Sequence, residues 1–205
     1  TLQTAVSNDE VENVTKKGHF YHFRYPVIDP KPGEPTHVVI ATTRPETMLG
    51  DTAVAVHPDP AKTLQKLESD LNEKLDGGSA KETAEIREQL DALIRRREEM
   101  LPKLEQLRDM AADGRQLMLP LANREIPLVA DVWAKPELGS GCVKITPAHD
   151  PNDYEVGERQ SLPMLNILNP DGTLNGLVPA YEGMTITQAR KQVVADLDAA
   201  GLLGD

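Results

Sequence analysis

The chain has 205 residues, enough to bury one sizeable core or a core with a large appendage. Its formal net charge of −11 and pI near 4.9 argue against a stand-alone nucleic-acid binder, because such proteins normally carry a basic surface. The single cysteine, Cys142, excludes an internal disulfide framework, and no apolar run reaches the length of a membrane span, so we expect a reducing, cytoplasmic setting.

The first third of the chain reads as β-structure. Residues 16 to 58 contain short runs rich in β-branched and aromatic residues, bounded by proline and glycine, and they predict strands near 20–25, 36–41 and 52–56. The chain starts without a methionine or a signal-peptide pattern, so we interpret it as a domain cut from a longer protein.

A helical period replaces the strand pattern from residue 60 to residue 113. Asp59 and Pro60 form an N-cap followed by proline at the first helical position, and leucines recur on one face of the following segment. Gly77-Gly78 interrupts the pattern, and Ser79 with Glu82 predicts a capping box for a second helix. We expect Pro102 to kink or split this second helix. The helix has an apolar seam with one charged member, Arg97: Ile86, Leu90, Leu93, Met100, Leu104, Leu107 and Ala111.

These residues are most simply an antiparallel helical hairpin with solvated charged faces. Residues 61–115 carry a net charge of −2, whereas the remainder of the chain carries −9. The run Arg95-Arg96-Arg97 offers a second interpretation, a contact with RNA, which Glu98 and Glu99 weaken.

The last third returns to strands and ends in a helix. Asn169-Pro170-Asp171-Gly172 predicts a tight turn, and an amphipathic helix of about 15 residues should begin after Thr185 and end at Gly201. The absence of a repeated strand-helix-strand alternation favours a β-barrel or an α+β fold over a doubly wound sheet. The expected strands lie near 117–121, 126–130, 142–146 and 164–168.

Two polar loops stand out because neither has the period of a helix face or a strand face. The first runs from Thr42 to Thr47, and the second from Lys144 to Tyr154. Lys144 lies within an apolar strand, where an unpaired charge costs free energy. The two loops therefore predict the rim of a site for a small polar substrate.

Each polar loop also has a purely structural interpretation. Asp150-Pro151 has the form of an N-cap with proline at the first helical position, and the threonines could be ordinary strand-end hydroxyls. A single histidine such as His149 is more often structural than catalytic. His149, Asp150 and Asp153 include metal-ligand types, but a second histidine at helical spacing is missing, so we expect no metal.

Two longer segments resemble a known family. Residues 41–58, which include Thr-Thr-Arg-Pro-Glu-Thr, and residues 139–157, which include Lys-Ile-Thr-Pro-Ala-His-Asp, are similar to the editing (CP1) domain of valyl-tRNA synthetases. Residues 11–13 and 18–26 resemble the start of that domain, and residues 184–203 resemble its final helix. The resemblance covers nearly the whole chain except residues 60–115.

The resemblance implies a fold and a division of the chain. The family fold is a closed β-barrel of about six strands with flanking helices, in the α+β or mainly β class. Residues 1–59 and 116–205 would form this barrel, and residues 60–115 would form a long helical hairpin inserted into it.

The resemblance also implies an activity, the hydrolysis of the ester that links threonine to the valine tRNA. The implied partners are the acceptor end of that tRNA, its terminal adenosine carrying threonine, and the rest of the synthetase chain. No cofactor, metal or membrane is implied, and we expect the isolated domain to be a monomer. The alternative is a non-catalytic insertion domain of a class I synthetase that docks tRNA or a protein partner.

Site residues carry over from the matching motifs. Asp153 would hold the α-ammonium of the substrate, Lys144, Thr146 and Asp150 would contact the threonine hydroxyl, and Thr43, Arg44 and Thr47 would face the terminal ribose and the ester. His149 and Thr42 are further candidates, as is Leu138, which stands where members of the family often carry an aromatic. No residue is an obvious general base, so the neighbouring hydroxyl of the tRNA is expected to help orient the attacking water.

Overall fold

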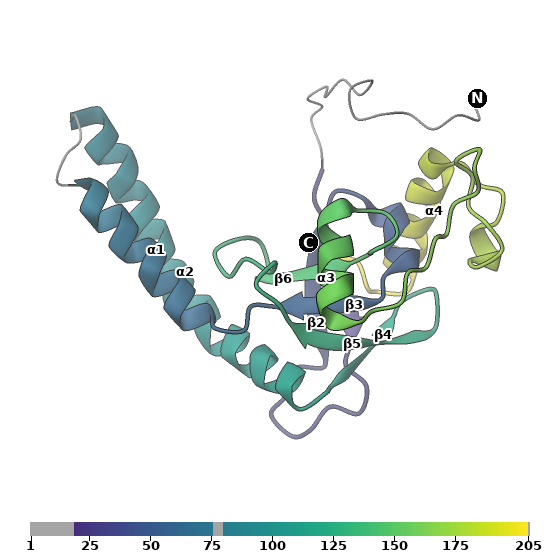
Figure 1. Ribbon diagram of the computed structural model, residues 1–205, viewed down its shortest axis with the longest axis horizontal. Coiled ribbons are helices and arrows are strands. Elements are labelled where there is room, and N and C mark those ends of the chain that lie inside the picture. The colour runs from purple at the N-terminus through teal and green to yellow at the C-terminus, as the bar shows by residue number, and fades with distance from the viewer. Residues whose placement is uncertain (1–18, 76–79, 205) are drawn as a thin grey trace.

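The computed structural model describes residues 19–75 and 80–204 (Figure 1). The expected domain start at residues 11–13, the Gly77-Gly78 break and the Ser79 cap lie outside the described residues. A body of two small sheets carries a long helical hairpin that extends away from it.

The six strands of the described part of the chain form two sheets. The first consists of β1 (Tyr21–Pro26) and β2 (His37–Thr42), which pair antiparallel. The second has the order β4-β5-β3-β6, in which β3 runs parallel to β5 and antiparallel to β6, and β4 runs antiparallel to β5. Its strands are β3 (Ala53–Val56), β4 (Gln116–Leu119), β5 (Arg124–Ala130) and β6 (Cys142–Ile145).

The expectation of a closed β-barrel was wrong. A closed barrel needs every strand to be hydrogen-bonded along both edges, whereas the described strands leave β4 and β6 as the outer strands of an open sheet. β2 lies beside β6 without a backbone ladder, and a single bridge between Val27 and Leu117 joins the two sheets. Pro147 lies two residues after the end of β6. Because proline has no N–H to donate, it cannot extend a backbone ladder from β6 to another strand. The fold is mixed α+β, with two open sheets and four α-helices among the described residues.

The remaining segments differ from the expectation at one strand. Residues 164–168 form no strand and make only an isolated bridge between Leu168 and Leu174. The final helix, α4 (Ile186–Ala199), begins after Thr185 with a complete capping box, and Gly201 follows it with φ +68°. Both ends of this helix agree with the prediction from the sequence.

Helices α1 (Pro60–Leu75) and α2 (Ala80–Ala112) form the expected antiparallel pair. The side chain of Asp59 accepts a hydrogen bond from the backbone N–H of Lys62 at 3.1 Å, as an N-cap should. Helix α2 continues through Pro102, so Pro102 does not split it, and a kink at that residue stays a prediction. Pro102 and Glu98 are both exposed, and water can replace the N–H that the proline lacks.

The packing of α2 divides the inserted hairpin into two parts. The base is the last turns of α2, from Leu104 onward, and the tip is the part of the hairpin that lies farther from the body. The last turns of α2 belong to the main core, because Leu104 is fully buried and Leu107 and Met110 are nearly so, in one cluster with Phe23 and Tyr25 of β1. The base therefore stabilises the body, whereas the tip packs mainly within the hairpin.

We predict that the two parts respond differently to deletion. Replacing residues 72–92 with a short Gly-Ser linker should keep a cooperative melt, with a Tm within about 2–4 °C of the original, the shift that about 1 kcal/mol produces at this size. Removing residues 61–115 should abolish the cooperative melt. The larger deletion takes three core side chains that are each worth about 2–5 kcal/mol, against a typical domain stability of about 5–15 kcal/mol.

Circular dichroism and calorimetry of both deletions provide the measurement. A cooperative melt of the larger deletion would show that the whole hairpin is dispensable for folding.

Candidate functional site

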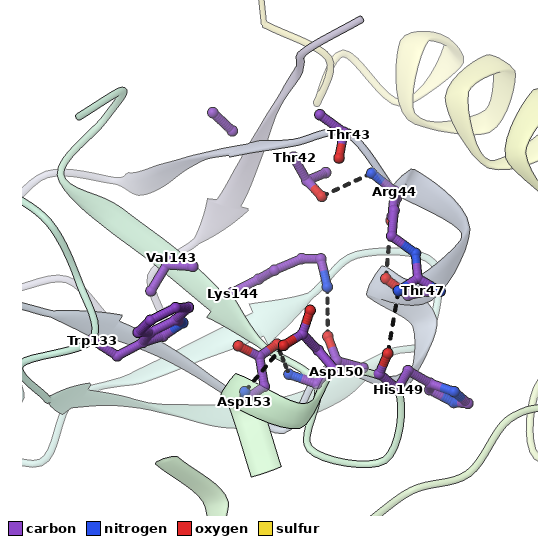
Figure 2. A pocket seen from close by; sticks show the side chains of 12 residues that line it. Thr42, Thr43, Arg44, Thr47, Trp133, Val143, Lys144, His149, Asp150 and Asp153 are labelled. Carbon is purple, nitrogen blue, oxygen red and sulfur yellow. Dashed lines mark hydrogen bonds between the residues drawn. The ribbon is translucent and has the colours of Figure 1, made fainter. Parts of the chain in front are cut away.

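A cavity of about 170 Å³ lies where the two polar loops meet (Figure 2). It brings together nine of the ten residues that the sequence singled out, from segments about a hundred positions apart. The lining residues are Ala41, Thr42, Thr43, Arg44, Thr47, Trp133, Val143, Lys144, Thr146, His149, Asp150 and Asp153. Leu138 is not among them, and its side chain is 63% exposed.

A buried ion pair lies next to the cavity, and its lysine, Lys144, lines the cavity. The Lys144 ammonium donates to Asp51 Oδ1 at 3.2 Å and to the hydroxyl of Thr146, which in turn donates to Asp51 Oδ1 at 2.6 Å. The hydroxyl of Tyr25 donates to Asp51 Oδ2 at 2.6 Å. Burial raises the pKa of Asp51, and the ammonium and the hydroxyls of Thr146 and Tyr25 oppose that rise. The charge of Lys144, which had no partner in the sequence pattern, is therefore matched by Asp51.

An ammonium has three N–H donors, and Lys144 uses two of them in this network. Figure 2 shows the Lys144 side chain extending between the wall formed by Trp133 and Val143 and the loop that carries Arg44. Its remaining donor is thus available to a ligand in the cavity.

Asp153 is the acidic group that the site leaves least satisfied. It lies in the first turn of α3 (Pro151–Gln160), where its Oδ2 accepts the backbone N–H of Thr146 at 2.9 Å. Its Oδ1 has no hydrogen-bond partner within residues 19–75 and 80–204. Burial raises the pKa of Asp153 to about 6, partly offset by the Thr146 N–H and the Lys144 charge. A cation placed beside Oδ1 would lower that pKa again.

Helix α3 is positioned by its cap and by one close contact. Asp150 Oδ1 accepts the backbone N–H of Asn152 at 2.8 Å and that of Asp153 at 3.3 Å, so the expected N-cap is present. A side chain at Gly157 could not fit, because its Cβ would lie 2.9 Å from Pro147. Asp150 thus serves as a cap through one oxygen while its other oxygen remains available to the cavity.

Arg44 links the two polar loops. Its guanidinium donates to the carbonyl oxygen of His149 at 3.2 Å, and its backbone N–H donates to the hydroxyl of Thr42 at 3.1 Å. The hydroxyl of Thr47 donates to the carbonyl oxygen of Arg44 at 3.0 Å, whereas Thr43 is exposed. The hydroxyls of Thr42 and Thr47 thus form hydrogen bonds within the loop, whereas Thr43 and Arg44 are exposed at the cavity.

His149 has a structural contact. The backbone N–H of Ile167 donates to His149 Nε2 at 3.1 Å, so this nitrogen is an acceptor and the ring is neutral. Burial lowers the pKa of His149, and the charges of Arg44 and Lys144 lower it further. Figure 2 shows the ring directed away from Lys144 and Asp153.

Two residues at the cavity were not predicted from the sequence. Trp133 forms part of the cavity wall, although nothing in its loop distinguished it from an ordinary packed aromatic. Asp51 lies outside both polar loops, and neither its burial nor its pairing with Lys144 can be read from the sequence. Within residues 19–75 and 80–204, no group of three or more His, Cys, Asp or Glu side chains has the arrangement of a metal site.

Comparison with known proteins places the chain in a family. A profile of the family described as "Leucyl-tRNA synthetase, editing domain" matches residues 21–196. The chain belongs to this editing-domain family. The resemblance that the two polar motifs indicated is thereby confirmed.

Valine–tRNA ligases are similar to this editing domain over its whole length. That of Rhodopirellula baltica is 72% identical over 204 residues, which is 100% of this chain and 20% of the ligase. That of Francisella tularensis is 44% identical over 98% of this chain and 17% of the ligase, so the alignment includes the inserted hairpin. The chain thus spans about a fifth of the length of these relatives.

A solved structure supports the fold. A LeuRS–tRNA–LeuAMS ternary complex from Agrobacterium radiobacter K84 matches with a TM-score of 0.52 and 17% identity, over 90% of this chain and 19% of that one. No helix in the described part of the editing domain is both long and apolar enough to cross a membrane.

We predict that Asp153→Asn stabilises the editing domain at high pH. The folded pKa of about 6 exceeds the ordinary value of 3.8, so the folded state carries a buried charge above pH 6. As pH falls from 6 to 3.8, the folded state takes up this proton before the unfolded chain does, and the penalty disappears. The variant should therefore have the higher Tm at pH 8, and the difference should vanish near pH 4.

Thermal melts across this pH range provide the measurement. Asp150→Asn is the matched control, because asparagine caps a helix about as well as aspartate does. A lower Tm of Asp153→Asn at pH 8 would mean that the carboxylate charge stabilises the fold.

Proposed function

We propose that this editing domain hydrolyses the ester of threonine-charged valine tRNA and spares the valine ester. The observation that carries the proposal is a small cavity in which a free carboxylate oxygen, a free ammonium donor and a second carboxylate converge. A threonyl ester carries a cation and a hydroxyl only a few bonds apart, and these groups match the cavity in chemical type.

Asp153 is proposed to bind the α-ammonium of the substrate. Its Oδ1 is unpartnered among the described residues, while Oδ2 is fixed by the N–H of Thr146 at 2.9 Å. A charge-assisted hydrogen bond to an ammonium is about twice as strong as a neutral one. Binding of the substrate ammonium would also neutralise the carboxylate charge, which the surrounding groups offset only in part. The position of Asp153 therefore favours a cation.

Lys144 and Asp150 are proposed to recognise the threonine hydroxyl. The remaining donor of Lys144 and the free oxygen of Asp150 supply a donor and an acceptor, which is what a hydroxyl requires. Thr146 instead holds Lys144 and Asp51 together, and its own hydrogen is already donated. Valine would leave these groups unpaired, at a cost of about 1–3 kcal/mol per buried group.

A separate editing site is useful because a single binding pocket discriminates poorly between amino acids of similar shape. A hydrophobic pocket rejects an isostere with an added hydroxyl only weakly, whereas a site built to hydrogen-bond that hydroxyl discriminates well. Thr43, Arg44 and Thr47 are proposed to face the ribose and the ester at the terminal adenosine of the tRNA.

Water is proposed to attack the ester without a protein general base. His149 is an unsuitable base, because its Nε2 already accepts from Ile167 and its ring is directed away from the carboxylates. The neighbouring ribose hydroxyl can orient the water, and the protein contributes position and electrostatics. The proposal includes no metal and no cofactor.

The alternative is a docking domain that binds tRNA or another partner without chemistry. The acidic surface, at a net charge of −11, favours neither strong independent tRNA binding nor RNA contact by the arginine run. Arg97 pairs with Glu68 across the hairpin, and Arg96 contacts backbone carbonyls of the body, so two of the three arginines have structural partners.

The test is side-by-side deacylation of threonine-charged and valine-charged valine tRNA, with the protein in excess over the tRNA. We expect the threonine ester to be hydrolysed faster, roughly 10- to 100-fold, from the loss of one hydrogen bond worth about 1–3 kcal/mol. Measurements at low salt favour tRNA binding to an acidic protein. Equal rates would contradict the proposed specificity, and no hydrolysis of either ester at saturating protein would favour the docking domain.

We further predict that Asp153→Ala reduces deacylation more than His149→Ala. The carboxylate is proposed to contact the substrate cation, whereas the imidazole supports the backbone at Ile167. A loss of roughly 100-fold or more for Asp153→Ala corresponds to removal of one charge-assisted contact of about 3 kcal/mol.

Single-turnover rates of both variants, with and without a chelator, complete this comparison. A near-normal Asp153→Ala beside an inactive His149→Ala would reverse the two roles. Strong inhibition by the chelator would restore the metal hypothesis.

A further inference from the structure

Arg96 of α2 contacts the body of the domain through three backbone carbonyls. Its Nε donates to the carbonyl of Pro136 at 2.7 Å, and its Nη2 donates to those of Leu138 and Gly139 at 2.9 and 3.0 Å. All three acceptors lie in the loop that joins β5 to β6. A planar guanidinium with donors in a fixed fork suits such a set of neighbouring acceptors.

The same loop carries a wall of the cavity. Trp133 lines the cavity, and its backbone N–H donates to Asp131 Oδ1 at 2.9 Å, while Asp131 is itself held by Arg159 of α3. The start of the loop is thus anchored to α3. Arg96 anchors its far part to α2.

The far part of the loop also passes close to the cavity. A Cβ built at Gly139 would lie 3.6 Å from the Cβ of Ala41, a lining residue on β2. Two residues further along, a Cβ at Gly141 would lie 2.5 Å from Leu104 of α2, so the loop runs directly against the helix. A displacement of residues 136–141 would therefore change the cavity wall at Ala41 and Trp133.

We propose that Arg96 is a positioning residue for the editing cavity: it holds the Pro136–Gly139 backbone so that the loop presents Trp133 to the bound aminoacyl end. The role in catalysis rests on the proposed hydrolysis of threonine-charged tRNA. The inserted hairpin contributes a side chain on which the site depends, although none of its residues lines the cavity.

Comparison with the two neighbouring arginines can separate a specific role of Arg96 from a general effect of positive charge on α2. Arg97 pairs with Glu68 of α1, and Arg95 is exposed and has no hydrogen bond or ion pair to the described residues. Arg95→Gln removes the same charge one position away, so it is a matched control for any general electrostatic effect on tRNA binding.

Trp133 supplies a readout that is independent of activity, because it is the only tryptophan of the chain. We expect Arg96→Gln to shift its fluorescence to longer wavelength and to increase quenching by acrylamide, since the loop is released. Arg96→Lys, which can still donate to a carbonyl, should show a smaller change. Arg95→Gln should leave the emission unchanged.

Single-turnover deacylation supplies the second readout. Arg96→Gln should lower the rate at saturating protein roughly tenfold, within the loss that a small misplacement of a bound substrate produces. The half-saturating protein concentration should change little, because the surfaces that hold the rest of the tRNA are unaltered. Arg96→Lys should recover part of the rate.

Unchanged emission in a folded Arg96→Gln protein would overturn the proposal, as would equal rate losses for Arg95→Gln and Arg96→Gln. If Arg96→Gln does not fold, the same criteria apply to Arg96→Lys. A wild-type chain that hydrolyses neither ester would refute the proposed function alone, because the emission of Trp133 would still report whether Arg96 holds the loop.

Discussion

The buried pairing of Lys144 with Asp51 is the constraint on which the site depends. An ammonium and a carboxylate removed from water must satisfy each other and their remaining hydrogen-bonding groups, and removing one partner of such a pair typically costs about 3–5 kcal/mol. Here the pair joins β6 to the segment before β3, and the hydroxyls of Tyr25 and Thr146 complete it. Asp51 accepts three donors, and Lys144 uses two of its own three, so one donor of Lys144 is left for the cavity.

A second consequence of this arrangement is a separation of roles among the three carboxylates. Asp51 neutralises the lysine, Asp150 caps α3 through one oxygen, and Asp153 keeps one oxygen unpartnered among the described residues. The charge of Asp153, which the Thr146 N–H and Lys144 offset only in part, is expected to lower the stability of the fold, which is a usual cost of a binding group. Its environment, rather than its residue type, makes Asp153 the group suited to a cation.

The sequence predicted local features well and non-local ones poorly. The caps at Asp59, Asp150 and Thr185 are short-range signals, and the structure contains all three. Barrel closure depends on pairing between distant strand edges, which no local pattern encodes, and that prediction was wrong. The polar loops were recognised from their motifs, but Asp51 and Trp133 acquire their roles only from partners that the fold brings near.

The inserted hairpin also has a place in how the chain folds. Strands β3 and β5 are parallel neighbours, and parallel neighbours require a crossover connection, which here consists of α1, α2 and β4. If this stretch were an unstructured loop, the pairing of β3 with β5 would carry the entropic cost of closing the loop of residues 57–123. Folding also becomes slower as the residues in contact lie farther apart in the sequence. An antiparallel helix pair returns the chain to the body of the domain, and most of the contacts of α1 and α2 are with each other. A hairpin that forms early would therefore shorten the effective loop and speed the assembly of the central sheet.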